Sequence, residues 1–159
     1  MHVASRRMLH VATTTVPSAD WLAQQLRQLT PFGQGPKFLL RDHDAKFGAV
    51  FDEVATGAGV RVIRTPVMAP KANAHCERLI GSVRRECLDH LLVVGERHLH
   101  RVLKEYRDYY NSCRPHQGIG QRRPDTFDRH TRAPRRVAPR HVISRPVLGG
   151  LHHDYRTAA

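Results

Sequence analysis

Apolar positions recur with two different periods near the start of the chain. Residues 6–15 (RRMLHVATTT) alternate, and Leu9 and Thr13 fall on the same side, which predicts a strand. Residues 16–29 instead repeat their apolar side chains at the spacing of a helix, and Ser18 supplies a hydroxyl suited to the N-cap. The pattern therefore predicts a strand followed by an amphipathic helix.

Two short apolar runs continue this alternation. Residues 37–41 (KFLLR) read as a strand, and their unbroken apolar centre predicts that both faces are covered. Apolar side chains then recur at i, i+3, i+4 and i+7 across residues 47–54, which predicts a helix that Gly57 and Gly59 end. Residues 60–65 (VRVIRT) read as a second strand. The order indicates an α/β layer.

The second half of the chain predicts two longer helices and a tail. Residues 66–75 are rich in turn formers, and helical stripes then run over about 74–92 and 96–111. Residues 121–146 contain four prolines and eight arginines and keep no amphipathic period, which predicts a mobile basic arm. Residues 147–159 end the chain with a short apolar patch that suits a strand or a docking segment.

Basic residues outnumber acidic ones, because 26 Lys and Arg against 14 Asp and Glu give a formal net charge of +12. Residues 42–89 hold seven basic and seven acidic side chains, whereas the flanking segments are basic. The surplus suggests an anionic partner, most simply nucleic acid. A neutral, acid-rich block between basic segments suits a metal-dependent enzyme that acts on a polyanion. A solvated, evenly charged surface with a basic tail explains the same distribution equally well.

Several classes of protein are not indicated. No apolar run has the length of a membrane span, and the N-terminus lacks the apolar core of a signal peptide. We therefore expect a cytoplasmic bacterial protein without membrane contact. The three cysteines form no CxxC pair, so the sequence does not indicate a disulfide framework or a structural zinc site.

Two carboxylates stand where chemistry is expected. Asp42 follows the strand 37–41, and ligand sites of open α/β sheets gather at the carboxyl ends of strands. Glu77 lies near the start of the predicted helix 74–92, at the border of its apolar stripe. Two carboxylates meeting over a strand end could hold Mg²⁺, although a pair of surface acids is a common alternative. Asp44 suits a cap of the following helix better than a metal ligand.

Three stretches together resemble a known family. They are RDHDAKF, RTPVMAPKANAHCERLIGSVRRECLD and YYNSCRPHQGIGQRRP, and they resemble the integrase core of DDE-type insertion-sequence transposases, which are relatives of retroviral integrases. The resemblance implies an RNase H-like fold, Mg²⁺ or Mn²⁺ as cofactor, and DNA strand transfer. Asp42 falls on the family's second catalytic aspartate and Glu77 on its glutamate, with 34 residues between them. It thus makes both carboxylates catalytic residues and metal ligands.

The match departs from the family at its first catalytic aspartate. The acid that precedes Asp42 is Asp20, which lies in the first turn of a predicted helix, where it suits the helix dipole. The resemblance therefore implies an α/β, RNase H-like integrase core that lacks its first strand and most of its second. This core with its C-terminal helix would occupy residues 1–120, and residues 121–159 would form a basic, largely irregular arm. We expect an unpaired edge at the strand 37–41 and a marginal, aggregation-prone or partner-dependent fold.

The resemblance and the charge pattern also suggest residues that contact DNA, with plain surface roles as the alternative. The candidates are Lys71, Asn73, Arg78, Arg84, Arg85, Arg114, Arg122, Arg123, Arg135 and Arg136. The implied partners are transposon ends, target DNA, and a second copy or an intact transposase. We expect DNA integration as the function, with little strand transfer by this chain alone. A non-catalytic DNA-binding remnant that pairs with an intact transposase and a metal-dependent nuclease of the same fold are the competing hypotheses.

Overall fold

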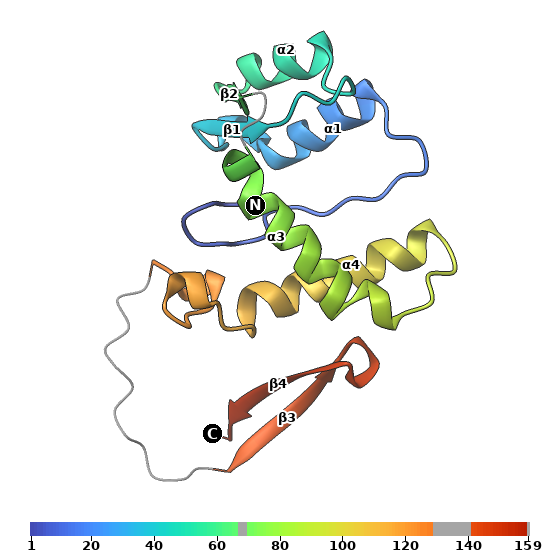
Figure 1. Ribbon diagram of the computed structural model, residues 1–159, viewed down its shortest axis with the longest axis vertical. Helices are drawn as coiled ribbons and strands as arrows, with labels where there is room; N and C mark the ends of the chain where they lie inside the picture. Colours follow the sequence, from blue (N-terminus) through green and yellow to red (C-terminus); the bar gives the residue numbers. More distant parts are fainter. Residues whose placement is uncertain (67–69, 129–140, 159) are drawn as a thin grey trace. The chain divides into compact units, whose positions relative to one another are not determined.

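The computed structural model describes residues 1–66, 70–128 and 141–158, and it leaves the side chains of residues 70–72 undescribed. Four helices lie in this part of the chain: α1 (Ala19–Leu29), α2 (Ala49–Gly57), α3 (Pro70–Glu86) and α4 (Glu96–Ser112) (Figure 1). Four strands accompany them: β1 (Phe38–Arg41), β2 (Arg61–Arg64), β3 (Val142–Val147) and β4 (His152–Thr157). Single 3₁₀ turns join them: η1 (Pro31–Gly33), η2 (Leu88–His90), η3 (Gln117–Ile119), η4 (Pro124–Thr126) and η5 (Leu148–Gly150).

The chain divides into two compact units. One comprises Thr14–Ile80, and the other comprises Met1–Thr13 together with Gly81–Ala159. Helix α3 contributes its first part to the Thr14–Ile80 unit and its last part to the Gly81–Ala159 unit. The expected division between residues 1–120 and 121–159 stays a prediction. Among the helices of the described residues, none is both long and apolar enough to cross a membrane.

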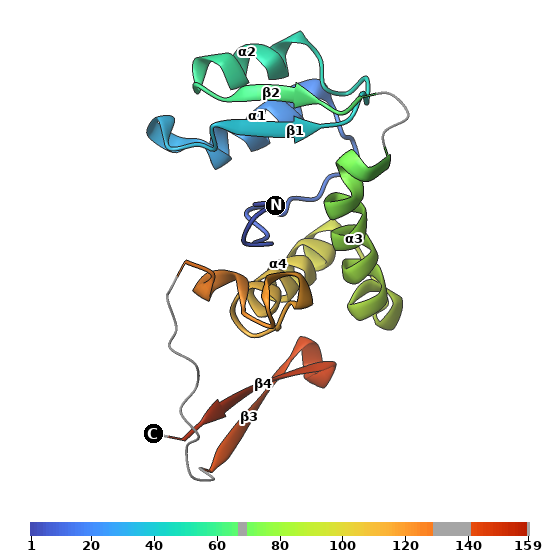
Figure 2. The same cartoon turned by 60° about the vertical axis from the view of Figure 1, so that its left-hand side comes forward.

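The Thr14–Ile80 unit is built on a two-stranded parallel sheet. β1 pairs with β2 in the register Phe38↔Arg61 to Arg41↔Arg64, and α1 and α2 lie together on one face (Figure 2). The core consists of Leu26, Phe51, Ala55 and Val60, with partly buried apolar side chains around it. The predicted helices and strands of this unit are confirmed, including the N-cap, since the Ser18 hydroxyl accepts the amide hydrogen of Trp21 at 3.1 Å.

The other face of this sheet is open, which makes the expectation of a strand covered on both faces wrong. The side chains of Leu39 in β1 and Val62 in β2 pack against the core. The alternating positions point away from it, so that Phe38 is 55% exposed, Leu40 39% and Ile63 42%. A continuous apolar run therefore does not guarantee burial on both faces, because covering requires a second layer as well as a suitable strand.

The predicted strand at residues 6–15 is also wrong. In the structure, residues 6–15 form neither a β-strand pairing nor a helix. A strand needs a neighbour to satisfy its amide and carbonyl groups, and the described residues provide no strand beside this segment. Met8 instead pairs its backbone with a side chain, as described below.

Helix α4 organises the Gly81–Ala159 unit. Its apolar side, with Val102, Tyr106 and Tyr110 buried, packs against η4, η5 and β3. β3 and β4 form an antiparallel hairpin paired from Val142↔Thr157 to Val147↔His152. We expected residues 121–146 to be irregular, and that expectation is wrong for β3. The strand that residues 147–159 suited is present as β4, while residues 129–140 lie outside the described part of the chain.

Candidate functional site

An ion-pair cluster, buried at Arg41 and exposed at Arg64, fixes the ends of the two parallel strands. Arg41, the last residue of β1, is buried, and its Nη2 donates to Asp52 Oδ1 at 3.1 Å. Arg64, the last residue of β2, donates from Nη2 to Asp52 Oδ2 at 2.9 Å. Burial opposes ionisation of Asp52, but the hydrogen bonds from both arginines outweigh it and hold the pKa of its carboxyl below the ordinary value. Asp52 of α2 thus ties the carboxyl ends of both strands together.

Asp42 follows directly and is exposed. Its backbone oxygen accepts a hydrogen bond from Arg41 Nη1 at 3.1 Å, so the same ion pair positions it. Its Oδ1 accepts the amide hydrogen of Asp44 at 3.2 Å, which closes a local turn. Next to it, His43 Nε2 lies 2.7 Å from the carbonyl oxygen of Thr65, just beyond β2. Asp42 is therefore presented to solvent at the shared carboxyl end of the sheet.

Asp44 does not cap the next helix, contrary to the sequence-based preference. The N-cap position of α2 belongs to Gly48. Asp44 Oδ1 accepts the amide hydrogen of Lys46 at 2.9 Å, and its Oδ2 lies 3.6 Å from the Lys46 ammonium. Asp44 thus stabilises the turn between β1 and α2.

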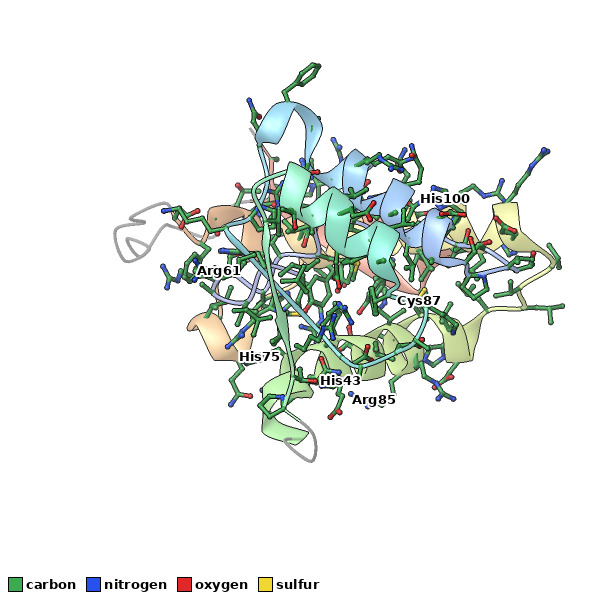
Figure 3. The ribbon with its side chains drawn as sticks, turned by 90° about the horizontal axis from the view of Figure 1, so that it is seen from above. His43, Arg61, His75, Arg85, Cys87 and His100 are labelled. Atoms are coloured by element: carbon green, nitrogen blue, oxygen red, sulfur yellow. The ribbon has the colours of Figure 1, made fainter. Side chains whose placement is uncertain are left out.

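Glu77 lies in α3 and belongs to the same compact unit as Asp42. Its side chain is exposed and makes no hydrogen bond or ion pair with another described residue. Nearby on the helix, Arg78 Nη2 lies 3.1 Å from His75 Nδ1, and His75 is labelled with His43 in Figure 3. The convergence of Asp42 and Glu77 on one ion stays a prediction.

The donor set fits a magnesium ion in part. Mg²⁺ takes oxygen ligands and is commonly bound through one or two carboxylates, while waters and substrate phosphates complete its octahedron. Asp42 and Glu77 supply exposed carboxylates of this kind. Within the described ranges, no group of three or more His, Cys, Asp or Glu side chains gathers as a ready-made metal cage. The chemistry therefore suits an ion shared with a phosphate ligand more than a closed structural metal site.

Three of the candidate DNA-contacting arginines are engaged inside the Gly81–Ala159 unit. Arg114 binds Glu86, as described below. Arg122 donates from Nε to the carbonyl oxygen of Ile119 at 3.0 Å, and Arg123 donates from Nη1 to that of Ser112 at 3.0 Å. Their binding to DNA stays a prediction, and the observed contacts give each of them a structural role.

The remaining candidates are placed differently. Arg84 and Arg85 are exposed in the last turn of α3, and Arg85 is labelled in Figure 3. Arg78 is exposed nearly two turns earlier in the same helix. Asn73 is half-buried in the first part of α3. The side chain of Lys71, and Arg135 and Arg136 entirely, lie outside the described part of the chain.

Sequence reasoning missed the polar network around Glu86. Its carboxylate accepts hydrogen bonds from the Tyr106 hydroxyl at 2.9 Å and from Arg114 Nε at 2.7 Å and Nη2 at 2.6 Å. Burial opposes ionisation of Glu86, but these donors hold its pKa below the ordinary value, and Glu86 in turn raises the pKa of Arg114. Nothing in local spacing marks Glu86, because its partners lie 20 and 28 residues further along the chain.

The YN…RPH motif builds the rest of this network. Arg114 lies over the ring of Tyr110 at 5.5 Å, and His116 packs edge-on against the same ring at 4.4 Å. His116 Nε2 lies 3.1 Å from the carbonyl oxygen of Tyr110. The motif that carries the family resemblance is thus an internal scaffold that joins the end of α3 to the end of α4.

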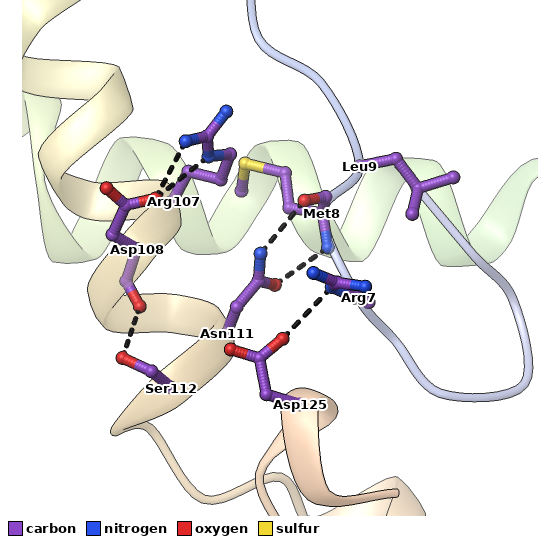
Figure 4. Close-up of a pocket in the computed structure, with 8 residues that line it drawn as sticks. All are labelled: Arg7, Met8, Leu9, Arg107, Asp108, Asn111, Ser112 and Asp125. Atoms are coloured by element: carbon purple, nitrogen blue, oxygen red, sulfur yellow. Dashed lines mark hydrogen bonds and ion pairs between the residues drawn. The ribbon is translucent and has the colours of Figure 1, made fainter. Parts of the chain in front are cut away.

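Asn111, in the same motif, holds the N-terminal segment against α4. Its Oδ1 accepts the amide hydrogen of Met8 and its Nδ2 donates to the carbonyl oxygen of Met8, both at 2.9 Å (Figure 4). Beside this pair, Arg7 forms an ion pair with Asp125 at 3.0 Å. A polar cavity of about 440 Å³ lies among these groups. One side chain therefore supplies the donor and the acceptor that a neighbouring strand would otherwise give.

Comparison with known proteins shows what this chain is similar to. A family model described as an integrase core domain matches residues 58–124. A 31.7 kDa protein of the insertion element IS407 from Burkholderia multivorans is 28% identical over 117 residues, which cover 73% of this chain and 42% of that protein. A 39.2 kDa protein of the insertion element IS476 from Xanthomonas euvesicatoria is 26% identical over 124 residues, 77% of this chain and 36% of that protein. The chain thus spans about two fifths of the length of these relatives.

A solved structure shares the fold. A chain of the simian T-cell lymphotropic virus intasome, determined by cryo-electron microscopy in complex with PP2A regulatory subunit B56 gamma, matches with a TM-score of 0.59. The match covers 89% of this chain and 53% of that one at 12% sequence identity. At this identity the likeness concerns the arrangement of helices and small sheets.

Proposed function

We propose that this chain belongs to the integrase cores of insertion-element transposases and is part of an enzyme that integrates DNA. The match of residues 58–124 to an integrase core domain model and the two similar insertion-element proteins support the proposal. The observation that carries the proposal is the placement of Asp42. It lies exposed at the shared carboxyl end of β1 and β2, held there through Arg41 and Asp52. Glu77, in the same compact unit, is the second carboxylate of the family pattern.

Asp42 and Glu77 are the residues that would hold Mg²⁺ or Mn²⁺. A divalent ion bound there would activate the attacking oxygen and neutralise the leaving oxygen of an in-line phosphoryl displacement. Asp52 supports this geometry by fixing Arg41, whose Nη1 hydrogen-bonds the backbone of Asp42. Exposure leaves both carboxylates open to a phosphate ligand.

The reaction we propose for the whole protein has two steps. Water first attacks one DNA strand and frees a 3′ hydroxyl, and that hydroxyl then attacks the phosphodiester bond of the target. The family uses a third acid, and the candidate that precedes Asp42, Asp20, lies instead in the first turn of α1. We therefore expect this chain by itself to bind DNA weakly and to transfer strands little or not at all.

A second role, as a non-catalytic partner of an intact transposase, is favoured by the open face of the β1–β2 sheet. Phe38, Leu40 and Ile63 are exposed there side by side on two strands. An apolar face of this kind suits contact with another protein. DNA binding without strand joining is the behaviour expected of such a partner.

Paramagnetic Mn²⁺ tests the proposed metal site without requiring activity. We expect low concentrations of Mn²⁺ to broaden the amide signals of residues 42–44 and of Glu77 together in the NMR spectrum of the full chain. Asp42→Asn should remove the broadening at both places, because each carboxylate binds the ion weakly alone. Asp89→Asn, at an exposed acid in the other unit, is the matched control and should change nothing. Broadening at one carboxylate only would contradict the shared site.

Strand joining tests the activity. Labelled duplexes that carry the ends of the insertion element are incubated with the chain, a plasmid target and Mn²⁺. Joining that Asp42→Asn abolishes indicates an active transposase, whereas binding without joining indicates the partner role. Cutting without joining indicates a nuclease, and the absence of any binding would sink the proposal.

A further inference from the structure

Four cationic or basic side chains form a row on the exposed face of α4. Arg97, Arg101 and Lys104 follow one another at spacings of four and three residues, which places them on one side of a helix, and His100 lies on the same side. All four are exposed, and His100 is labelled in Figure 3. The opposite side of α4 carries the buried residues of the core, so the row does not contribute to packing.

The three acids of the same helix, Glu96, Glu105 and Asp108, form no ion pair with the row among the described residues. Glu105 accepts the amide hydrogen of Leu148 at 2.6 Å, and Asp108 pairs with Arg107 at 2.8 Å. No ion pair joins Arg97, Arg101 or Lys104 to a carboxylate among the described residues.

Four other arginines of this unit are paired with acids. Arg7, Arg107, Arg114 and Arg156 each form an ion pair with an Asp or Glu of the same unit. Arg84, Arg85, Arg122, Arg123 and Arg145 of this unit likewise form no ion pair with a described carboxylate. The row differs from them because its cations share one exposed side of a single helix.

From this geometry we infer that the exposed face of α4 binds the phosphate backbone of DNA. Arg97 and Lys104 are seven positions apart, so the row is about 10 Å long at a rise of about 1.5 Å per residue. Phosphates follow one DNA strand at about 3.4 Å per step along the axis, so the row matches about three steps. Contacts of this kind give affinity and orientation without reading sequence. The inference rests on the proposed function and assigns its DNA-contacting surface.

Salt dependence of DNA binding tests the inference. The probe is a fluorescent duplex of random sequence, and the full chain is titrated onto it at several salt concentrations. Replacing Arg101 and Lys104 with Gln should flatten the slope of log K against log salt by about 2, because each lost phosphate contact removes about 0.9. Affinity at low salt should fall about tenfold or more. Gln is a good helix former, so α4 is expected to persist.

A matched pair of variants separates position from total charge. Arg27→Gln with Lys37→Gln removes the same charge from exposed sites of the Thr14–Ile80 unit and should leave the slope unchanged. Arg101→Lys with Lys104→Arg keeps the charge on α4 and should keep the slope. If both neutralised pairs lowered the salt slope of DNA binding equally, the inference would be overturned. The total charge of the chain would then explain the binding without a specific surface on α4.

Two other results are also decisive. Unchanged DNA binding together with a changed oligomeric state in sedimentation would overturn the inference and identify the row as a contact between copies. A wild-type chain that binds no DNA would overturn both the inference and the proposed function. The Mn²⁺ experiment tests the proposed function separately from the α4 surface, because α4 carries no proposed metal ligand. Failure of the α4 inference would therefore leave the Mn²⁺ result unchanged.

Discussion

At the scale of single residues, Asn111 bridges two segments that are 103 positions apart in the sequence. Its amide is buried and satisfies both the donor and the acceptor of Met8. A buried polar group without a partner costs about 1–3 kcal/mol. Loss of the Asn111 amide would leave two backbone groups of Met8 without a hydrogen-bond partner. The N-terminal segment therefore depends on one side chain more than on its own propensity for a strand.

Replacing Asn111 with Leu should destabilise the Gly81–Ala159 unit by about 2–4 kcal/mol, because both hydrogen bonds to Met8 are lost. Hydrogen exchange provides the direct measurement: the Met8 amide, slow in the wild type, should exchange at the rate of an open segment. Asn73→Leu, the same chemical change in α3, is the control and should leave Met8 protected. Retained protection in the Asn111 variant would contradict the assigned role.

At the scale of elements, the β3–β4 hairpin is attached to the helices through few side chains. His152 stacks on Tyr109 with ring centroids 4.5 Å apart, and its Nε2 lies 2.7 Å from the carbonyl oxygen of Glu86. Glu105 accepts the amide hydrogen of Leu148 in the turn. Most other side chains of the hairpin are exposed, so these contacts set its stability against local opening.

His152→Ala should loosen the hairpin selectively. The stacked pair contributes about 0.5–1.5 kcal/mol and the hydrogen bond about 1 kcal/mol, so opening of residues 142–157 should become roughly tenfold or more easier. Hydrogen exchange of the hairpin amides measures the change, and α1 and α2 should not respond. His153→Ala, at the exposed neighbouring position, is the matched control. Equal effects of the two substitutions would show that the stacked ring of His152 does not stabilise the hairpin.

The helices and strands also show which parts of the fold can be predicted from the sequence. Local periodicity predicted α1, β1, α2, β2 and α4, because each carries its own apolar stripe or run. Local periodicity wrongly predicted a strand at residues 6–15 and burial of β1 on both faces. Both features depend on neighbouring elements, which the local sequence pattern does not reveal. Helix α3 begins at Pro70 rather than near residue 74, since Pro is well tolerated in a first turn.

The candidate site divides in the same way. Motif and spacing predict Asp42 and Glu77 as the site residues, and their roles stay predictions. The structure places Asp42 directly after the end of β1. The supporting residues Asp52 and Glu86 were not located, because each acts through partners distant in sequence. Motifs mark the residues that a family shares, whereas supporting contacts emerge only from the folded geometry.

At the scale of the whole molecule, the stability of the Gly81–Ala159 unit is coupled to proton uptake. Burial lowers the pKa of His116, and the positive charge of Arg114, 3.3 Å away, adds to the effect, although the hydrogen bond to the Tyr110 carbonyl opposes it. As the pH falls, His116 of the unfolded chain therefore takes up a proton at a higher pH than His116 of the folded chain, which stays neutral longer. Its contribution is complete above its unfolded pKa of 6.5 and is lost as the pH falls below that value.

Stability should accordingly decrease between pH 7.5 and pH 5.5. In His116→Gln the same pH change should have a smaller effect, because the group that titrates is gone. Urea unfolding followed by tyrosine fluorescence at several pH values measures the difference, and His153→Gln is the control at an exposed site. Glu86 contributes separately: its pKa is lowered in the folded state, so its contribution is lost only below about pH 4.5. Parallel pH profiles of wild type and His116→Gln would argue against the coupling.

The open face of the β1–β2 sheet has a consequence for the behaviour of the chain in solution. A net charge of +12 keeps molecules apart by mutual repulsion, whereas bare Phe38, Leu40 and Ile63 draw them together. Added electrolyte screens the repulsion and leaves the apolar attraction intact, and sulfate strengthens that attraction. The ionic strength that releases nucleic acid during purification is therefore also the one at which this protein is most prone to precipitate.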